Sequence, residues 1–238
     1  MAFRSFLLIL SFMAAVFAAP TAAQAQYGPG VPAVLERARA AMGGNAAWAA
    51  VRGFHETGSE GGQPYQRWID TLRYGERTEI GTGPQRFVQG YNGYGAWWLP
   101  YGRARPPGSD AELMARARSE AFFGAYGYLF PGRFDFRSTF LGVRPSGGKS
   151  FNVIRVHPEA GAPREIWFDR ATGLPGRMVE GRAAETLTLE FADYRRVGRL
   201  MLPFHVTATG AGRTRPVERR LERIEVVAPD RALFSLPR

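Results

Sequence analysis

The stretch from Arg164 to Met178, REIWFDRATGLPGRM, places an acid before a Thr-Gly pair and so invites comparison with a catalytic loop. Aspartic proteases need an Asp directly followed by Thr/Ser-Gly, but Arg170 and Ala171 intervene here. They also need a second such loop to complete a dyad of two carboxylates, and the sequence offers none. The residues alternate on both sides of Asp169–Gly173, and Asp and Gly both favour turns. We therefore interpret this stretch as a hairpin turn with a structural role.

Other residues that could do chemistry lack the spacing that chemistry needs. His55, His157 and His205 fall on three separate predicted strands, without the His-x-His or His-Glu-x-x-His spacing of common metal sites. The sequence contains no Gly-x-Ser-x-Gly elbow and no P-loop. Glu76 and Glu79 are paired acids, which we interpret as solvated strand ends. We accordingly predict no catalytic residue, no metal ligand, no cofactor and no enzymatic activity.

The first residues predict export. Arg4 precedes an apolar run from Phe6 to Ala19, and Ala23-Gln24-Ala25 provides the small residues that signal peptidase requires. The apolar run is shorter than the roughly 20 residues of a membrane-spanning helix. We expect residues 1–25 to form a signal peptide cleaved after Ala25, and residues 26–238 to form one monomeric periplasmic domain. The chain has no cysteine, so it can form no disulfide and cannot be a lipoprotein.

The chain is basic, with 31 Lys and Arg against 21 Asp and Glu. All but Lys149 of these cations are arginines, and they are spread along the sequence. Two interpretations stay open: the codon bias of a GC-rich genome, or a basic face for an acidic ligand or an anionic membrane. Because the basic residues form no clustered stripe, we do not expect a nucleic-acid partner.

Local composition predicts three helices. Good helix formers span 31–42 and are followed by Gly43-Gly44, and Asn45 is placed to cap a second helix over 46–51. Ser109 and Glu112 have capping-box spacing, which predicts a third helix over 110–126 after a Gly/Pro/Arg-rich loop over 100–108. The end of this third helix, AFFGAYGYLF, is strongly apolar and could act as a lid.

The rest of the chain reads as strands joined by short turns. Asn92-Gly93 between aromatic runs is typical of a hairpin turn, and short loops imply antiparallel pairing. A sheet of this size must curl or split. Period-two alternation and turn residues predict strands over 65–74, 77–82, 85–91, 135–143, 150–158, 163–169, 174–180, 185–194, 201–209 and 218–227.

Aromatic residues make up 13% of the chain. They could form an ordinary core, or they could line a concave sheet face that is only partly filled and so binds a long apolar ligand. Alternation along the predicted elements selects as candidate groove residues Trp68, Trp97, Phe122, Phe123, Tyr126, Trp167, Phe168, Phe191 and Phe204.

Several segments occur in an order that resembles the LolA-like superfamily of bacterial outer-membrane lipoprotein-sorting proteins, in a diverged branch. They are AMGGNAAWAAVRGFHETG, GYNGYGAWW, IWFDRATGLPGRM, FADYRRVGRLMLPFHV and APDRALFSLP. The resemblance implies a mainly β (α+β) fold: an open, strongly curved antiparallel half-barrel of about ten or eleven strands with helices covering the concave face. It also implies the acyl chains of lipids or lipoproteins as ligands.

This resemblance makes a periplasmic carrier or binding protein for acyl chains the first hypothesis. A second hypothesis is a sensor or adaptor that uses the same fold to bind an envelope membrane protein. A third is an envelope hydrolase, which would require His157 or His205 to lie with acids at a cavity mouth.

Overall fold

A computed structural model describes residue 28 and residues 30–99, 111–181 and 186–236 of the chain. Its strands form one twelve-stranded sheet in the order β5-β4-β3-β2-β1-β12-β11-β10-β9-β8-β7-β6. All eleven strand pairs are antiparallel, and β1 with β12 is the only pair that joins strands far apart in the sequence. The sheet is therefore two meanders, β1–β5 and β6–β12, joined along β1 and β12.

The strands of the first meander have four to eight residues, and those of the second have six to eleven, with four of eleven residues. Their bounds are β1 Gly53–Glu60, β2 Gln63–Asp70, β3 Glu76–Ile80, β4 Phe87–Tyr91, β5 Ala96–Leu99, β6 Phe136–Ser146, β7 Lys149–Pro158, β8 Arg164–Asp169, β9 Pro175–Glu180, β10 Leu187–Val197, β11 Leu200–Gly210 and β12 Val217–Val227.

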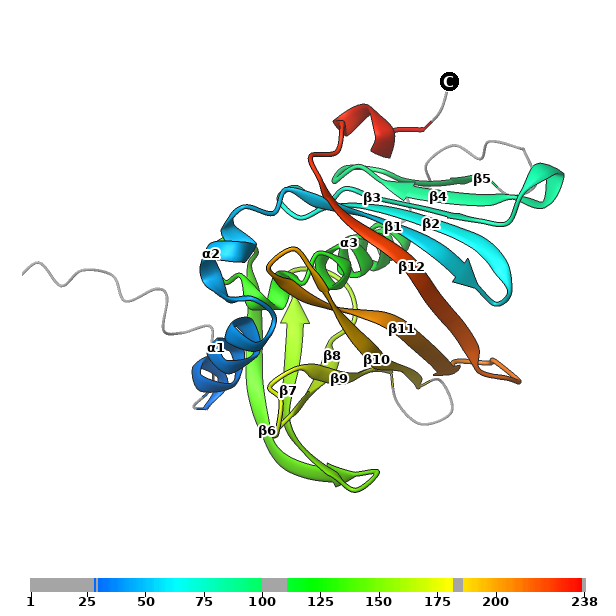
Figure 1. Ribbon diagram of the computed structural model, residues 1–238. Helices are drawn as coiled ribbons and strands as arrows, with labels where there is room; N and C mark the ends of the chain where they lie inside the picture. Colours follow the sequence, from blue (N-terminus) through cyan, green and yellow to red (C-terminus); the bar gives the residue numbers. More distant parts are fainter. Residues whose placement is uncertain (1–27, 29, 100–110, 182–185, 237–238) are drawn as a thin grey trace, which may run out of the picture.

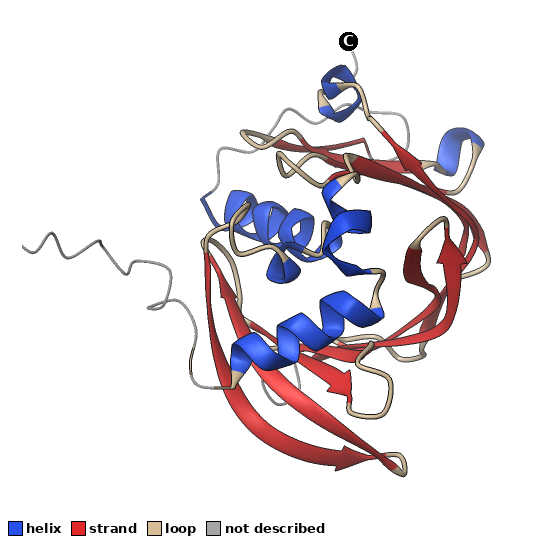
Figure 2. Cartoon of the chain, turned by 60° about the vertical axis from the view of Figure 1, so that its left-hand side comes forward, coloured by secondary structure: helices blue, strands red, loops and turns tan. Residues whose placement is uncertain are grey.

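The sheet curls around the helices, which lie on its concave side (Figures 1 and 2). These are α1 (Val31–Ala41), α2 (Gly44–Ala49), α3 (Ala111–Gly124) and the short 3-10 turn η3 (Gly127–Leu129). Two further 3-10 turns, η1 (Gly83–Gln85) and η5 (Arg231–Phe234), lie at the β3–β4 connection and near the end of the chain. The predicted open half-barrel is thus confirmed, with twelve strands instead of ten or eleven.

Helix α1 illustrates how sequence sets local structure here. Pro32 occupies its first turn, where the missing N–H costs nothing. Val31, Val34, Leu35 and Ala38 recur at helical spacing and are buried against the sheet. Gly43 takes φ 120° directly after the helix, a backbone conformation that favours glycine, and so ends it.

Of the local features predicted from the sequence, one is confirmed, one is wrong and others fall outside the described residues. The hairpin turn at Asn92 forms, with its side-chain oxygen accepting hydrogen bonds from the N–H groups of Tyr94 and Gly95. The prediction that Asn45 caps α2 is wrong, because Gly43 holds the cap position and no side chain caps the helix. The predicted signal peptide, the loop over 100–108 and Ser109 of the predicted capping box lie outside the described residues.

Candidate functional site

The concave face of the sheet is filled by aromatic side chains of the segment from α3 through η3. Phe122, Tyr128 and Leu129 are at most 1% exposed. Tyr126 takes a left-handed φ of 55°, which turns the chain from α3 into η3. Its ring packs 5.4 Å from that of Trp48 in α2, so the segment is joined to the first helices. We call residues 122–130 the aromatic plug.

Packing in this interior is dense. The ring of Trp48 also lies 5.3 Å from that of Phe130 and 5.9 Å from that of Phe54 on β1, and its indole N–H donates to the carbonyl of Met42. Of the two alternatives for the aromatic residues, this packing favours a filled core: in the described part of the chain, the protein's own rings occupy the space that an apolar ligand would need.

A buried arginine of the second meander forms an ion pair with α3. Arg164 on β8 is 3% exposed, and its guanidinium donates to Glu120 of α3 at 2.5 Å and to Glu180 of β9 at 2.5 Å. The same guanidinium lies 4.4 Å from the ring centroid of Phe123. Burial raises the pKa of Glu120, but the charge of Arg164 more than offsets it, so the pKa lies below its usual value. The carboxylate therefore stays ionised and holds the helix.

A second polar cluster lies on the concave face of the first meander. Arg67 on β2 donates to Glu76 on β3 at 2.9 Å and lies 3.9 Å from Glu56 on β1, and both carboxylates are buried. Tyr65 donates its hydroxyl proton to Glu56 at 3.3 Å. The interpretation of Glu76 as a solvated strand end is wrong, because its carboxylate belongs to this cluster.

Arg67 also meets α3. A Cβ added at Gly124, the last residue of the helix, would lie 2.0 Å from a terminal nitrogen of Arg67. The absence of a side chain at this position is what lets the helix end approach the cluster. Sequence reasoning missed the cluster, although the alternation of Tyr65, Arg67 and Ile69 places the arginine on an apolar strand face.

Six of the predicted groove residues do contribute to the interior. Phe122, Phe123, Phe168 and Phe204 belong to the buried core, and Tyr126 and Phe191 pack against it while remaining partly exposed. The structure therefore brings these six to one side of the sheet, where they pack against one another and the helices.

Trp68 lies on the other face of the sheet. Its ring stacks on His55 with centroids 4.5 Å apart, and cross-strand partners continue this row to Arg77, Gly90 and Trp97. The row is therefore part of the outer surface of the first meander.

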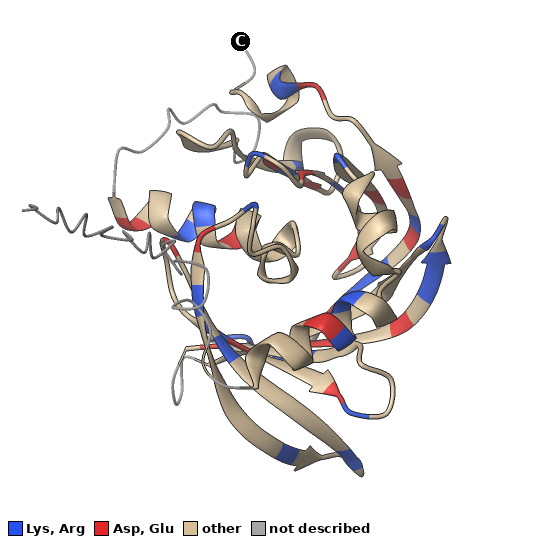
Figure 3. Cartoon of the chain, turned by 90° about the vertical axis from the view of Figure 1, so that its left-hand side faces the viewer, with Lys and Arg blue, Asp and Glu red and all other residues tan. Residues whose placement is uncertain are grey.

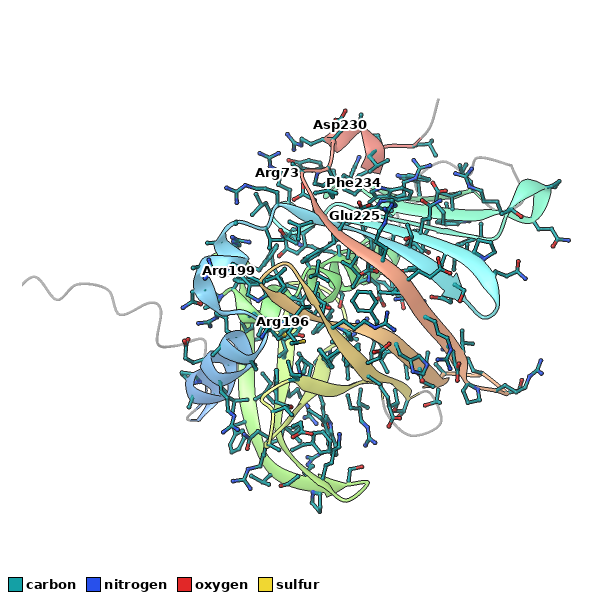
Figure 4. All side chains as sticks on the ribbon, in the orientation of Figure 1. Arg73, Arg196, Arg199, Glu225, Asp230 and Phe234 are labelled. Carbon is teal, nitrogen blue, oxygen red and sulfur yellow. The ribbon has the colours of Figure 1, made fainter. Side chains whose placement is uncertain are left out.

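The C-terminal turn η5 covers one end of this outer row. The indole of Trp97 donates to the carbonyl of Phe234 at 2.8 Å, and Arg77 donates to the carbonyl of Leu233 at 3.2 Å. Figure 4 shows Phe234 close to the β3–β5 edge, with Glu225 of β12 below it. Trp97 is thus buried by the chain's own C-terminal segment.

Trp167 also lies on the outer face, in the second meander. It packs against Phe151 and lies between the guanidinium groups of Arg144 and Arg177, which are 5.6 and 5.1 Å from its ring. Trp167 therefore lies apart from the plug, as Trp68 and Trp97 do.

The turn at Asp169 has the structural role that the sequence predicts. Its carboxylate accepts hydrogen bonds from the N–H groups of Ala171 and Thr172, and the N–H of Gly173 donates to the carbonyl of Asp169 at 2.7 Å. Gly173 takes φ 82°, which allows the turn to close.

The histidines lie far apart in the sheet. His55 is 3.5 Å from Glu225, and His205 is 3.7 Å from Glu218. That second distance is too long for a hydrogen bond, and Arg220 holds the Glu218 carboxylate at 2.6 Å. Burial and the charges of nearby arginines lower the pKa of His157. His55 and His205 thus each lie beside a glutamate, and these contacts are ion pairs only when the histidine is protonated.

Two open cavities lie at the turns of the sheet, away from the plug. The first, of about 280 Å³, is lined by the β3–β4 connection and β2, and its cation Arg86 is paired with Glu79 at 2.8 Å. The second, of about 770 Å³, lies between the β1–β2 and β11–β12 turns.

Within the described residues there is no group of three or more acids and histidines placed to hold a metal. No helix of the described chain is long and apolar enough to cross a membrane.

No protein-family model and no curated protein matches the sequence. Among solved structures, the chain is similar to a LolA superfamily protein from Nitrosomonas europaea, with TM-score 0.59 and 12% identity over 87% of this chain and 97% of that one. It is similar also to a DUF1329 family protein from Desulfovibrio piger, with TM-score 0.58 and 10% identity over 86% and 97% of the two chains. The chain therefore has a LolA-like fold, as the sequence motifs predict.

Proposed function

We propose that this chain is a periplasmic carrier or binding protein for the acyl chains of lipids or lipoproteins, and that the structure is its closed, unloaded form. The observation that carries the proposal is the aromatic plug on the concave face of a sheet with two free edges. In the loaded form, an acyl chain takes the place of the plug against the same sheet residues.

The free energy gained by burying an acyl chain is similar in size to that gained by burying the plug. Burying an acyl chain of about 16 carbons is worth roughly 12 kcal/mol, at about 0.8 kcal/mol per methylene. Burying the large side chains of the plug is worth roughly 1.5–3 kcal/mol each. Phe122, Phe123, Tyr128 and Leu129 are all buried in the closed form, and Tyr126 and Phe130 are partly buried. Exchange of plug for ligand is therefore close to balanced, as a carrier that must also release its load requires.

The ion pairs of α3 oppose its displacement, and a ligand that replaces the plug must break them. Glu120 remains 42% exposed, so water can reach the Arg164 ion pair as the helix leaves. Arg118 of α3 also pairs with Glu159 in the β7–β8 connection. Both pairs hold the helix in place. Because they are partly exposed, separating their charges costs less free energy than separating deeply buried charges would.

The first test is direct. The mature protein, purified from the periplasm without detergent, is extracted with organic solvent, and the extract is examined by mass spectrometry. We expect stoichiometric lipid, or saturable uptake of a fluorescent fatty acid by the stripped protein. An extract without lipid, together with no uptake, would rule out acyl carriage.

A second test asks whether the plug and the ligand compete. Glu120→Gln removes the ion pair between α3 and Arg164 and should raise the affinity for the fluorescent fatty acid several-fold. Glu190→Gln breaks a comparable exposed pair with Arg177 away from the helix, and its affinity should equal that of the wild type. Equal affinities in all three proteins would contradict the proposed exchange.

A further inference from the structure

The larger cavity is built where two turns of the sheet meet. The N–H of Gly61 in the β1–β2 turn donates to the carbonyl of Glu218 on β12 at 2.9 Å, which ties this turn to the start of β12. The N–H of Arg213 in the β11–β12 turn donates to the carbonyl of Gly210 at 3.1 Å, which closes the second turn. Figure 1 shows both turns at the side of the molecule opposite α1 and α2. We call the space between them the turn groove; its volume is about 770 Å³.

Cations dominate the lining of this groove. Arg213, Arg215 and Arg220 all line it and all are exposed, while Glu218 is the single carboxylate in the lining. Glu218 is engaged by Arg220 at 2.6 Å. Among the described residues, Arg213 and Arg215 are thus left without an acidic partner.

The two remaining arginines are free to bind a ligand. Arg213 reaches only the carbonyl of Gly210, at 3.4 Å, and Arg215 makes no hydrogen bond or ion pair within the described chain. Most other arginines of the sheet are paired, as with Arg219 and Glu60 at 2.5 Å. Figure 3 shows acidic and basic residues together on α1 and α3, whereas the lining of the turn groove holds three arginines and one glutamate.

The remaining lining suits a tetrahedral oxyanion. Ser59 and Thr214 add hydroxyl groups, and Gly61, Gly62 and Gly212 add backbone without side chains. These three glycines have φ between 56° and 79°, so substitution there would strain the backbone as well as narrow the groove. Guanidinium forks match the oxygens of phosphate, and hydroxyl and backbone N–H groups complete such sites.

We propose that the turn groove binds a phosphate group, either as the free ion or as part of an anionic lipid, between the guanidinium groups of Arg213 and Arg215. The site is independent of acyl carriage, since none of its lining residues belongs to the aromatic plug or to the buried core.

Inorganic phosphate is the first probe. It is titrated into ¹⁵N-labelled protein at constant ionic strength, with chloride as the balancing anion. We expect saturable shifts of backbone amides around Gly212–Arg215. The variant Arg213→Ala/Arg215→Ala should bind roughly 10-fold more weakly, because it removes two charge-assisted hydrogen-bonding groups. The matched control Arg137→Ala/Arg170→Ala removes two exposed arginines elsewhere and should bind like the wild type.

Vesicles then identify the source of the phosphate. Sedimentation with phosphatidylglycerol vesicles is compared with neutral phosphatidylcholine vesicles. If the source is lipid, the wild type binds only the anionic vesicles, and the Arg213/Arg215 double variant binds them roughly 30-fold more weakly. Phosphate binding without vesicle binding assigns the groove to the free ion.

Two outcomes would overturn the site. One is a phosphate titration with no saturable shift. The other is equal weakening by the groove variant and the control variant, which would show a general effect of net charge. Uptake of the fluorescent fatty acid should be the same in both variants and the wild type, so failure of the phosphate site is distinguishable from failure of acyl carriage.

Discussion

Buried arginines set the behaviour of this protein at the scale of single residues. Arg67 and Arg164 each lie between two carboxylates on the concave side, and each touches α3, at Gly124 and Glu120 respectively. Burying such charges in place of apolar side chains adds little to stability. Removing one partner is destabilising, because it leaves the other charge buried without a partner. Their effect is to fix where α3 lies on the sheet.

The pair formed by Glu120 and Arg164 predicts a pH dependence. The pKa of Glu120 is lowered in the folded protein, so its ionised form contributes stability above the usual glutamate pKa of about 4.3 and loses it as the pH falls through the folded value. Glu120→Gln should cost about 1 kcal/mol at pH 7, since the pair is partly exposed, and the difference from wild type should shrink below about pH 4.

Urea unfolding across pH 3–7 measures this difference. Glu222→Gln is the control, because Glu222 is exposed and makes no ion pair within the described chain. A Glu120 variant whose deficit is the same at every pH would show that the lost stability came from packing and not from charge.

Residues involved in local structure were predictable, and those involved in long-range contacts were not. The turns at Asn92 and Asp169 follow from side chains that bond to their own backbone within three residues. The pairing of Arg67 with Glu56 and Glu76 requires three strands in register, which a single sequence does not fix. Alternation alone places Arg67 on the same strand face as Tyr65 and Ile69 but names no partner for it.

At the scale of elements, the end of α3 is the most sensitive point. A glycine in a helix is normally less stable than alanine by roughly 0.5–1 kcal/mol. At Gly124 the sign should reverse, since an alanine Cβ would lie 2.0 Å from Arg67 and 3.2 Å from a Glu76 oxygen. We expect Gly124→Ala to destabilise the protein by about 1–3 kcal/mol, the usual cost of overpacking.

The matched control for that substitution lies eight residues further on. Gly132→Ala adds a Cβ with no atom within 4 Å, and it should leave stability unchanged or slightly higher. Thermal unfolding measures the stability of both variants relative to the wild type. A stabilised Gly124 variant would mean that Arg67 moves aside freely, and the helix end would then not be held by the cluster.

Element types were predictable from periodicity, but the faces that elements bury were harder to assign. Trp68 and Trp167 follow the alternation of their strands, which gives two faces without saying which one meets the helices. Trp97 is buried partly by η5, which lies far away in the sequence and accepts its indole N–H. The aromatic end of α3 was recognisable from composition alone, and the structure places it at the centre of the concave face.

At the scale of the whole molecule, the sheet is open along β5 and β6, so its curvature is not fixed by closure into a barrel. The pair of β1 with β12 joins the two meanders, and α3 spans them on the concave side through Arg67 of one and Arg164 of the other. Displacement of α3 would therefore release both meanders from a common contact while leaving their ladders intact. In the proposed exchange, a ligand would therefore enter without unfolding any strand.

Hydrogen exchange provides the test of that motion. On saturation with a long-chain fatty acid, the amides of the aromatic plug, residues 122–130, should exchange at least about 10-fold faster, because their hydrogen bonds open when the plug leaves. The amides of β1 and β12 should keep their protection, since that ladder stays paired. Butyrate, which is too short to replace the plug, is the control and should change neither region. Saturation by the long-chain acid with the plug still protected would place the ligand elsewhere and would contradict the exchange of plug for acyl chain.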